Sequence, residues 1–256
     1  MAGQKFKNLE IKHIEFNAQR TLRTTKPSLF EARKSGELLL LQDANIAFAN
    51  QILSLNQQSQ IDLADALTSY KKINMSPCID IKHDDLTDSL KTYLTSLGFE
   101  LVETLNFLSI QCADIQQTIP KIKVERLQPK HANIFLDLLK TSGLQCTDDI
   151  WQLKQQHYCT ERFRCFIAKI DGQPRALATT FIDEQYGLLA NAFTQADFQN
   201  IGCQTALLTA RLQDAKSLGL SALIVDVIPN TASERNCLKL GFQPLETRYI
   251  WQKPDK

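Results

Sequence analysis

Hydrophobic and polar positions form regular patterns from residue 124 onward, and these patterns predict strands and helices in turn. Asp171-Gly172 is typical of a two-residue hairpin turn, so the apolar stretches on either side of it are expected to pair as antiparallel strands. The strands predicted in this way cover residues 124–127, 163–170, 175–181, 188–194 and 222–228. Helical spacing predicts four helices. The first carries Ile134, Leu136, Leu138 and Leu139, and the second, capped by Thr147 or Asp148, carries Trp151 and Leu153. The third carries Leu208, Leu212 and Ala215, and the last lies between Asn230 and Gly241. This order of elements is that of a mixed α/β domain.

The first half of the chain shows similar patterns. Apolar spacing predicts one helix with Phe48, Ile52 and Leu55 and a second with Leu63, Leu67 and Tyr70. Residues 78–81 are expected to form a short strand. Asp84 or Asp85 is expected to cap a helix that carries leucines at positions 86, 90, 94 and 97. Gly98 ends that helix and precedes a strand pair.

An internal repeat links the two halves. Residues 98–107 read GFELVETLNF and residues 241–250 read GFQPLETRYI, with Gly, Phe, Glu and Thr in common and a leucine before each segment. The repeat and its helix–glycine–strand context indicate duplication of a fold unit. The polar stretch 116–123, which contains Pro120, has the composition of a linker. The sequence therefore predicts two domains, at 1–118 and 119–256.

Composition and charge exclude several classes of protein. Apolar residues make up 43% and charged residues 22% of the 256 positions, as in an ordinary globular protein. Lys and Arg (29) balance Asp and Glu (28), so the basic excess typical of nucleic-acid and membrane-surface binders is missing. The sequence has no apolar run long enough to span a bilayer and no signal-peptide pattern. Seven scattered cysteines without a Cys-x-x-Cys pair predict free thiols, a cytoplasmic location and no metal site.

The segment 194–208, TQADFQNIGCQTALL, carries the candidate chemistry. It follows a predicted apolar strand and opens a helix, so unpaired backbone N–H groups and the positive end of the helix dipole meet there. Such a place suits a phosphate, and Gly202 allows the backbone to approach closely. A glycine that merely makes a turn is the alternative reading of the same residues.

This segment resembles the coenzyme A loop of the GNAT superfamily of N-acetyltransferases, whose pattern is Gln/Arg-x-x-Gly-x-Gly/Ala. It reads Gln199-Asn200-Ile201-Gly202-Cys203-Gln204 here, with glutamine where the family has glycine or alanine. Residues 230–242, NTASERNCLKLGF, resemble the second signature of the family, an Asn-x-x-Ala/Ser motif followed by a helix that ends in Lys-Leu-Gly-Phe. The resemblance covers about residues 124–253.

The resemblance implies an acetyl-CoA-dependent N-acetyltransferase. It implies a mixed, mostly antiparallel twisted sheet with a gap between the strands at 188–194 and 222–228, where the coenzyme lies. Backbone groups of Asn200, Ile201, Gly202, Cys203, Gln204 and Thr205 would hold the pyrophosphate, Ala192, Phe193 and Thr194 would run beside the pantetheine arm, and Asn230 would lie near the acetyl end. A neutral primary amine would attack the thioester directly, without a metal.

Two positions depart from the family pattern or invite a catalytic role. Many relatives have a tyrosine seven residues after the asparagine, where this chain has Cys237; the thiol could protonate the leaving thiolate or fill the core. Asp226, the only charged residue of its predicted strand, is the candidate base or a structural carboxylate. Glu184 and Tyr186 are weaker candidates for substrate contact, and His157 and Tyr158 are expected at the surface end of a helix. The Gln204 side chain could crowd the phosphate or add a hydrogen bond to it.

The first half lacks a phosphate loop, because no glycine lies between Gly36 and Gly98. It is therefore interpreted as a degenerate GNAT-like copy that covers the core, shapes the amine pocket or mediates contact between subunits. The sequence leaves open whether the protein is a monomer or a homodimer, and whether its acceptor is a small amine or a peptide N-terminus. The alternative to an enzyme is a catalytically silent protein that binds coenzyme A or serves as a scaffold.

Overall fold

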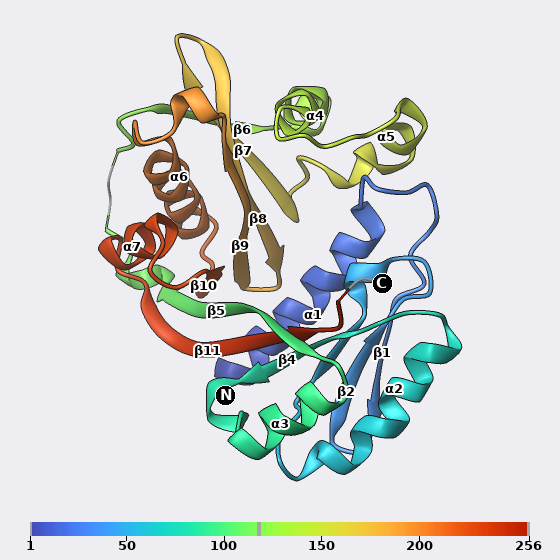
Figure 1. Cartoon of the computed structure of the whole chain (residues 1–256). Helices are drawn as coiled ribbons and strands as arrows, with labels where there is room; N and C mark the ends of the chain where they lie inside the picture. The colour runs from blue at the N-terminus through green and yellow to red at the C-terminus, as the bar shows by residue number, and fades with distance from the viewer. Residues whose placement is uncertain (1, 117–118, 255–256) are drawn as a thin grey trace.

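A single mixed β-sheet runs through the whole molecule in the computed structural model, which describes residues 2–116 and 119–254 (Figure 1). Within these residues the sheet has 11 strands in the order β1-β2-β3-β4-β11-β5-β10-β9-β8-β7-β6. The strands are β1 (Glu31–Ser35), β2 (Leu38–Gln42), β3 (Gln51–Leu53), β4 (Cys78–Lys82), β5 (Glu100–Gln111), β6 (Lys123–Leu127), β7 (Phe163–Ile170), β8 (Gln173–Asp183), β9 (Tyr186–Thr194), β10 (Ala222–Val227) and β11 (Gln243–Gln252).

Helices cover both faces of this sheet. They are α1 (Ala2–Arg20), α2 (Leu63–Lys72), α3 (Asp88–Ser96), α4 (Ala132–Lys140), α5 (Asp148–Lys154), α6 (Cys203–Ser217) and α7 (Ala232–Lys239). Buried side chains of α2, α3, α6 and α7 pack on one face, and those of α1, α4 and α5 pack on the other. No helix of the described chain has the length and apolar character needed to cross a membrane.

The predicted strands and helices of the second half are confirmed. β7 coincides with residues 163–170, and Asp171-Gly172 forms the hairpin turn to β8, with both residues at positive φ. Helix α4 differs in detail, because Ile134 is exposed while Phe135 lies in the core.

Two predictions for the first half are wrong. The segment around Phe48 and Ile52 is a short 3-10 helix (η1, Ala47–Ala49) followed by β3, because the Asn50 side chain bonds the carbonyl groups of Asp43, Ile46 and Ala47 and ends the turn. The cap of α3 is Thr87, whose hydroxyl accepts from the Leu90 amide, and neither Asp84 nor Asp85 caps the helix. In addition, α1 was not predicted.

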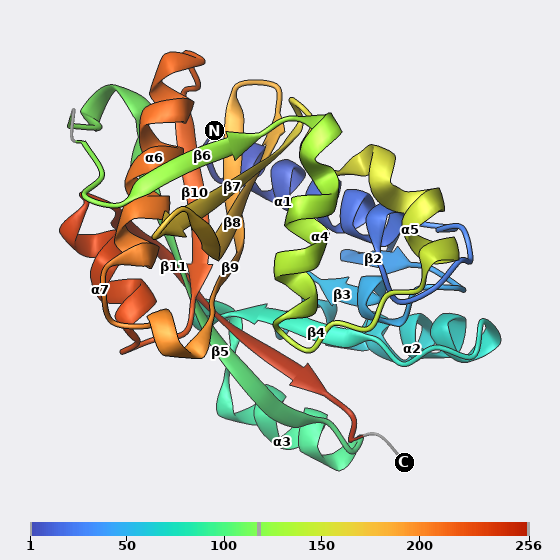
Figure 2. The ribbon, with the colours of Figure 1, turned by 90° about the horizontal axis from the view of Figure 1, so that it is seen from above.

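The two halves exchange their last strands. β3 and β4 are parallel neighbours in the first half, and β9 and β10 are parallel neighbours in the second. Each pair is followed by a helix and a long strand, but β5 pairs with β10 of the second half and β11 pairs with β4 of the first. β5 and β11 also pair with each other, and the two long strands run side by side in the middle of the strand order (Figure 2).

The sequence repeat marks a pseudo-twofold relation between the halves. Gly98 and Gly241 both adopt positive φ at helix ends, and the amide that follows each donates back into the last turn of α3 or α7. In the repeat, residues 143 positions apart are equivalent, so Leu105 is equivalent to Arg248. These two residues also lie directly opposite each other in the β5–β11 pair, so the local twofold axis passes between them.

The same relation makes Asp80 and Asp226 equivalent. Asp80 pairs with Ile250 and Asp226 pairs with Phe107, and Ile250 and Phe107 are the same position of the repeat. The strand register also equates Ser54 after β3 with Asn191 in β9, and both residues have positive φ.

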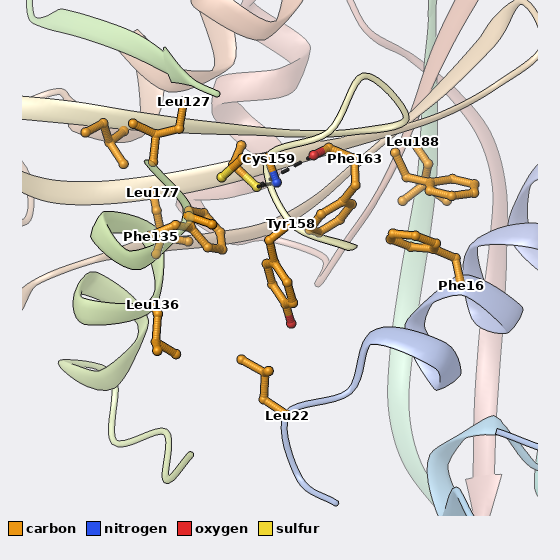
Figure 3. Close-up of a cluster of buried hydrophobic side chains, with 14 of the residues drawn as sticks. Phe16, Leu22, Leu127, Phe135, Leu136, Tyr158, Cys159, Phe163, Leu177 and Leu188 are labelled. Atoms are coloured by element: carbon orange, nitrogen blue, oxygen red, sulfur yellow. Dashed lines mark hydrogen bonds between the residues drawn. The ribbon is translucent and has the colours of Figure 1, made fainter. Parts of the chain in front are cut away.

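Helix α1 joins the two halves. Its Phe16 ring lies 5.2 Å from the ring of Phe163 in β7, and Figure 3 shows Phe16 and Leu22 reaching the cluster that holds Tyr158 and Phe163. On its other side, Ala18 packs with Ile46 and Ala49 of the first half. The helix therefore crosses the middle of the sheet (Figure 1).

Candidate functional site

The N-terminus of α6 is open to an anion. Gly202 precedes the helix with φ 99°, in the region that favours glycine, and no side chain caps the helix. The Ala206 amide donates to the Gly202 carbonyl at 3.0 Å, whereas the amides of Cys203, Gln204 and Thr205 have no hydrogen-bond acceptor among the described residues. Three N–H groups and the positive end of a 15-residue helix thus meet at one place.

The Gln204 side chain does not obstruct this place. Its amide Nε2 donates to the Thr194 hydroxyl at 2.9 Å, which turns the side chain back toward β9. The contact ties the start of α6 to the end of β9, and Gln199 Nε2 lies 3.5 Å from the Thr194 carbonyl on the same side. The predicted loop residues and Thr194 therefore do come together.

β9 separates from β10 beyond Leu189. The parallel pairing covers residues 186–189 and 222–225, and the β8–β9 register then shifts at a bulge. The bulge is held by Thr179, whose hydroxyl donates to the Ala190 carbonyl at 3.1 Å and accepts from the Asn191 side chain at 3.0 Å. The segment with Ala192, Phe193 and Thr194 is left without a strand partner on the β10 side, so its backbone can pair with a ligand.

Asp226 lines a cavity of about 570 Å³ on the face of the sheet that α1 covers. The cavity is bounded by both halves of the molecule: Phe6, Lys7, Glu10, His13 and Ile14 of α1; Gln51, Leu53, Ser54, Leu55 and Asn56; Asp80, Lys82 and Asp85; Leu105 and Phe107 of β5; Leu188, Ile224 and Asp226; and Leu245, Glu246, Arg248 and Ile250 of β11. The Asp226 side chain is exposed to the cavity, and the neighbouring protein atoms reduce its hydration, which raises its pKa above the ordinary value. No ion pair engages it within residues 2–116 and 119–254.

Arg248 organises the other carboxylates of the cavity. Its Nη2 lies 2.8 Å from Glu10 Oε2, its Nη1 lies 3.1 Å from Asp80 Oδ2, and it also pairs with Glu246. Its guanidinium carbon is 4.0 Å from the centre of the Phe107 ring. These carboxylates raise the pKa of Arg248, so it is permanently charged.

Two residues of α1 have strongly shifted pKa values. Desolvation raises the pKa of Glu10 to about 7, although Arg248 opposes the shift. Desolvation, followed by the charge of Arg20, lowers the pKa of His13 to about 3, so His13 is neutral at physiological pH. Sequence reasoning missed these residues because α1 was not predicted. The register of the repeat, which equates Asp80 with Asp226, is the signal that could have revealed the first half of the cavity.

Cys237 lies in the core between α7 and α6. It is 2% exposed, belongs to the same cluster as Leu208, Leu212 and Phe242, and does not line the cavity. Desolvation raises the pKa of its thiol to about 11, with a smaller opposing effect of Arg211. The sequence left open whether Cys237 donates a proton or fills the core, and its position in the structure favours the core role.

In the first half, the segment equivalent to the start of α6 has several of its amides bonded to side chains. Asn56 Oδ1 accepts from the amides of Gln58 and Ser59, both at 2.9 Å, and the Ser59 hydroxyl accepts from the Asn56 amide. A 3-10 turn (η2, Ser59–Asp62) then leads into α2. The amides of Asn56, Gln58 and Ser59 ahead of α2 are thus bonded to side chains, and no glycine lets a phosphate approach.

The remaining sequence candidates lie outside the cavity. Asn230 is exposed and has φ 63°; its amide donates to Glu234 Oε2 at 2.6 Å, just after β10. Glu184 is in the β8–β9 turn, and the ring of Tyr186 contacts Phe6 edge-on at 5.8 Å. Tyr158 is buried, and Arg20 donates to its hydroxyl at 3.0 Å, so the expected surface position is wrong for it. The described residues contain no group of three or more side chains suited to a metal ion.

Comparison with known proteins gives one family match. The model of the acetyltransferase (GNAT) family matches residues 133–242. No curated protein sequence matches the chain.

Solved structures match over almost the whole chain. A GCN5-related N-acetyltransferase from Kribbella flavida has a TM-score of 0.68 at 14% identity and covers 98% of this chain and 95% of its own. A functionally unknown conserved protein from Staphylococcus epidermidis has a TM-score of 0.66 at 11% identity, with 90% and 95% coverage. A tandem GNAT protein from the clavulanic acid biosynthesis pathway has a TM-score of 0.58 at 10% identity, with 97% and 95% coverage. At these identities the likeness is one of fold.

Proposed function

We propose that this protein is an acetyl-CoA-dependent N-acetyltransferase with one coenzyme site, in its second half. The match of the acetyltransferase (GNAT) family model to residues 133–242, and the likeness of the whole fold to a tandem GNAT protein, support this proposal. The observation that carries the proposal is the uncapped start of α6 beside the open segment of β9. Free amides suit the pyrophosphate, and the segment with Ala192, Phe193 and Thr194 suits the amide-containing pantetheine arm.

The first half is proposed to shape the acceptor site and to bind no coenzyme. Support comes from the Asn56 contacts, which occupy the amides ahead of α2, and from the share of the cavity lining that β3, β4 and α1 provide.

Asp226 is proposed as the proton acceptor. The amine nitrogen bonds to the thioester carbonyl carbon, the carbon–sulfur bond breaks, and the amine proton passes to the Asp226 carboxylate. A thiol has an ordinary pKa of about 8.5, so the coenzyme can leave as a thiolate without an obligatory acid. The raised pKa of Asp226 brings its basicity closer to that needed near neutral pH.

Calorimetric titration with acetyl-CoA, desulfo-CoA and adenosine diphosphate tests the coenzyme site. We expect micromolar binding that Gly202→Val abolishes, because valine at φ 99° distorts the loop and displaces the three amides. Gly219→Val is the matched control: Gly219 has φ 68° at the other end of α6, with open space around its Cβ position. Equal affinity in the Gly202→Val variant would remove the assignment.

The alternative is a catalytically silent protein that keeps the coenzyme site. Titration cannot separate it from an enzyme, so binding is followed by an assay of thiol release with a panel of amines. Binding without release from any amine would favour the silent protein.

A further inference from the structure

The charged residues of the cavity fall into a paired group and an unpaired group. Arg248 engages Glu10, Asp80 and Glu246, and Lys82 Nζ lies 2.7 Å from Glu246 Oε2. Among the described lining residues, Asp226, Asp85 and Lys7 remain outside ion pairs. Asp85 is half-buried in the turn after β4 (η3, His83–Asp85).

Lys7 is the one cation in this lining that no carboxylate engages within ion-pair distance. Its ammonium donates to the Ser54 hydroxyl at 2.6 Å, at the end of β3. Desolvation, and then the positive charges of Lys82 and Arg248, lower its pKa. The carboxylates of Asp80 and Glu10 act in the opposite direction. An anion bound at the Lys7 ammonium would offset the repulsion from Lys82 and Arg248 and stabilise the charged lysine.

Lys7 and Asp226 stand at opposite ends of the cavity. Ser54 follows β3 and Asp226 lies in β10, and the intervening order β3-β4-β11-β5-β10 makes four steps between strands. At about 4.8 Å a step the two ends are separated by roughly 19 Å across the sheet. Arg248 lies between Lys7 and Asp226, and its charge affects the pKa of each. The charges of Lys7 and Asp226 do not contribute to each other's pKa.

We propose that the acceptor is a short peptide whose N-terminal amine lies at Asp226 and whose far end carries a carboxylate that Lys7 binds. This inference rests on the proposed acetyl transfer for the role of Asp226, but the binding geometry stands on the cavity alone. Two hydrogen bonds of about 2.8 Å at the ends leave at least about 13 Å for the ligand. That span corresponds to roughly four extended residues at about 3.4 Å each.

The middle of the cavity suits such a chain. Leu105, Phe107 and Ile224 provide apolar surface, and Asp80 Oδ1 is buried without a hydrogen-bond partner among the described residues, so it can accept from a peptide N–H group.

The test uses randomised peptide mixtures of two to seven residues with a free amino end and either a carboxylate or a carboxamide at the other end. Peptides retained by the full-length protein without coenzyme are identified by ultrafiltration and mass spectrometry, and acetylation of the same mixtures is then measured with acetyl-CoA. We expect retention to peak at four residues, within one residue, and to fall about 10- to 100-fold on amidation.

A charge reversal separates recognition from folding. Lys7→Glu is expected to abolish the preference for a carboxylate end and to favour peptides that end in lysine amide, which a damaged fold cannot imitate. Lys12→Glu is the matched control, because Lys12 lies on the same helix, is about half exposed and faces away from the cavity lining.

The outcomes distinguish this inference from the proposed function. Retention that depends on length and carboxylate without any acetylation would overturn the transferase and support the peptide site. Acetylation or retention that ignores length and terminal charge, or the absence of any retained peptide, would overturn the peptide site.

Discussion

Asp80 and Asp226 are equivalent residues with different neighbours. Arg248 lies 3.1 Å from Asp80, while the residue equivalent to Arg248 beside Asp226 is Leu105. Asp80 is therefore compensated by an ion pair, whereas Asp226 feels the charge of Arg248 only from beyond ion-pair distance. A single difference between the two copies of the repeat separates a structural carboxylate from a candidate base.

Replacement of this unpaired carboxylate should slow the reaction and stabilise the protein. We expect Asp226→Asn to lower kcat by about 10²- to 10⁴-fold, the usual contribution of a general base. Because the folded-state pKa of Asp226 is raised above 3.8, its ionisation opposes folding, and wild-type stability falls as pH rises through that range. The variant should have the higher Tm at pH 7.5 and the same Tm as wild type below pH ~3.5. A lower Tm at pH 7.5 would contradict the assigned environment.

Arg248 is expected to be the most costly charged side chain to remove. Arg248→Met leaves the largely buried carboxylates of Glu10 and Asp80 without their cation, while Glu246 keeps Lys82, and it should lower the free energy of unfolding by about 3–5 kcal/mol at pH 7.5. Urea denaturation should show a smaller loss at pH 5, where Glu10, with a pKa of about 7, is protonated. Arg235→Met, at an exposed position on α7, is the control and should cost little. A loss that does not change with pH would argue against the carboxylates as its cause.

Cys237 can be tested in the same way. Cys237→Ala should lower the free energy of unfolding by about 1–2 kcal/mol through the cavity that it leaves, with turnover unchanged. Reduced kcat at unchanged stability would restore the role of an acid.

Among the elements, α6 and α2 occupy equivalent places and differ in how their first amides are satisfied. The amides at the start of α6 have no acceptor among the described residues, and two amides ahead of α2, those of Gln58 and Ser59, are bonded to Asn56. Asn56→Ala should therefore destabilise the protein by about 1 kcal/mol without changing its affinity for acetyl-CoA, as thermal denaturation and calorimetry would measure. Weaker acetyl-CoA binding in this variant would place the coenzyme in the first half instead.

The sequence predicted an element correctly where a single local pattern, such as an apolar run or a glycine at a helix end, was enough to define it. The strands from 163 to 227 are buried and rich in apolar residues, and Gly98 and Gly241 end helices as expected. It failed at β3, a three-residue strand whose limits depend on the contacts of Asn50, and at α1, whose apolar face is interrupted by polar residues that line the cavity. The open start of α6 was predictable because it is local. The Arg248 cluster was not, because it joins Glu10, Asp80 and Glu246 across 238 positions of the chain.

For the whole molecule, the exchange of β5 and β11 bears on the predicted boundary between residues 118 and 119. The fragment 119–256 lacks β5, so the edge of β10 that β5 covers would be open. We expect this fragment to be insoluble or to self-associate when expressed alone, and to form a soluble complex when fragment 1–118 is co-expressed. Size-exclusion chromatography of both preparations measures this. A stable monomer of 119–256 would mean that the half folds by itself.

The exchange also has a consequence during synthesis on the ribosome. β4 cannot gain its neighbour β11 until about 130 further residues have followed β5, which at ~5–20 residues per second takes roughly 7–26 s. The first half must wait through that interval with an uncovered strand, and it cannot complete its sheet before the second half has left the tunnel. The first half therefore cannot finish folding before the second, and the edge of β4 stays open to pairing with other chains until β11 arrives.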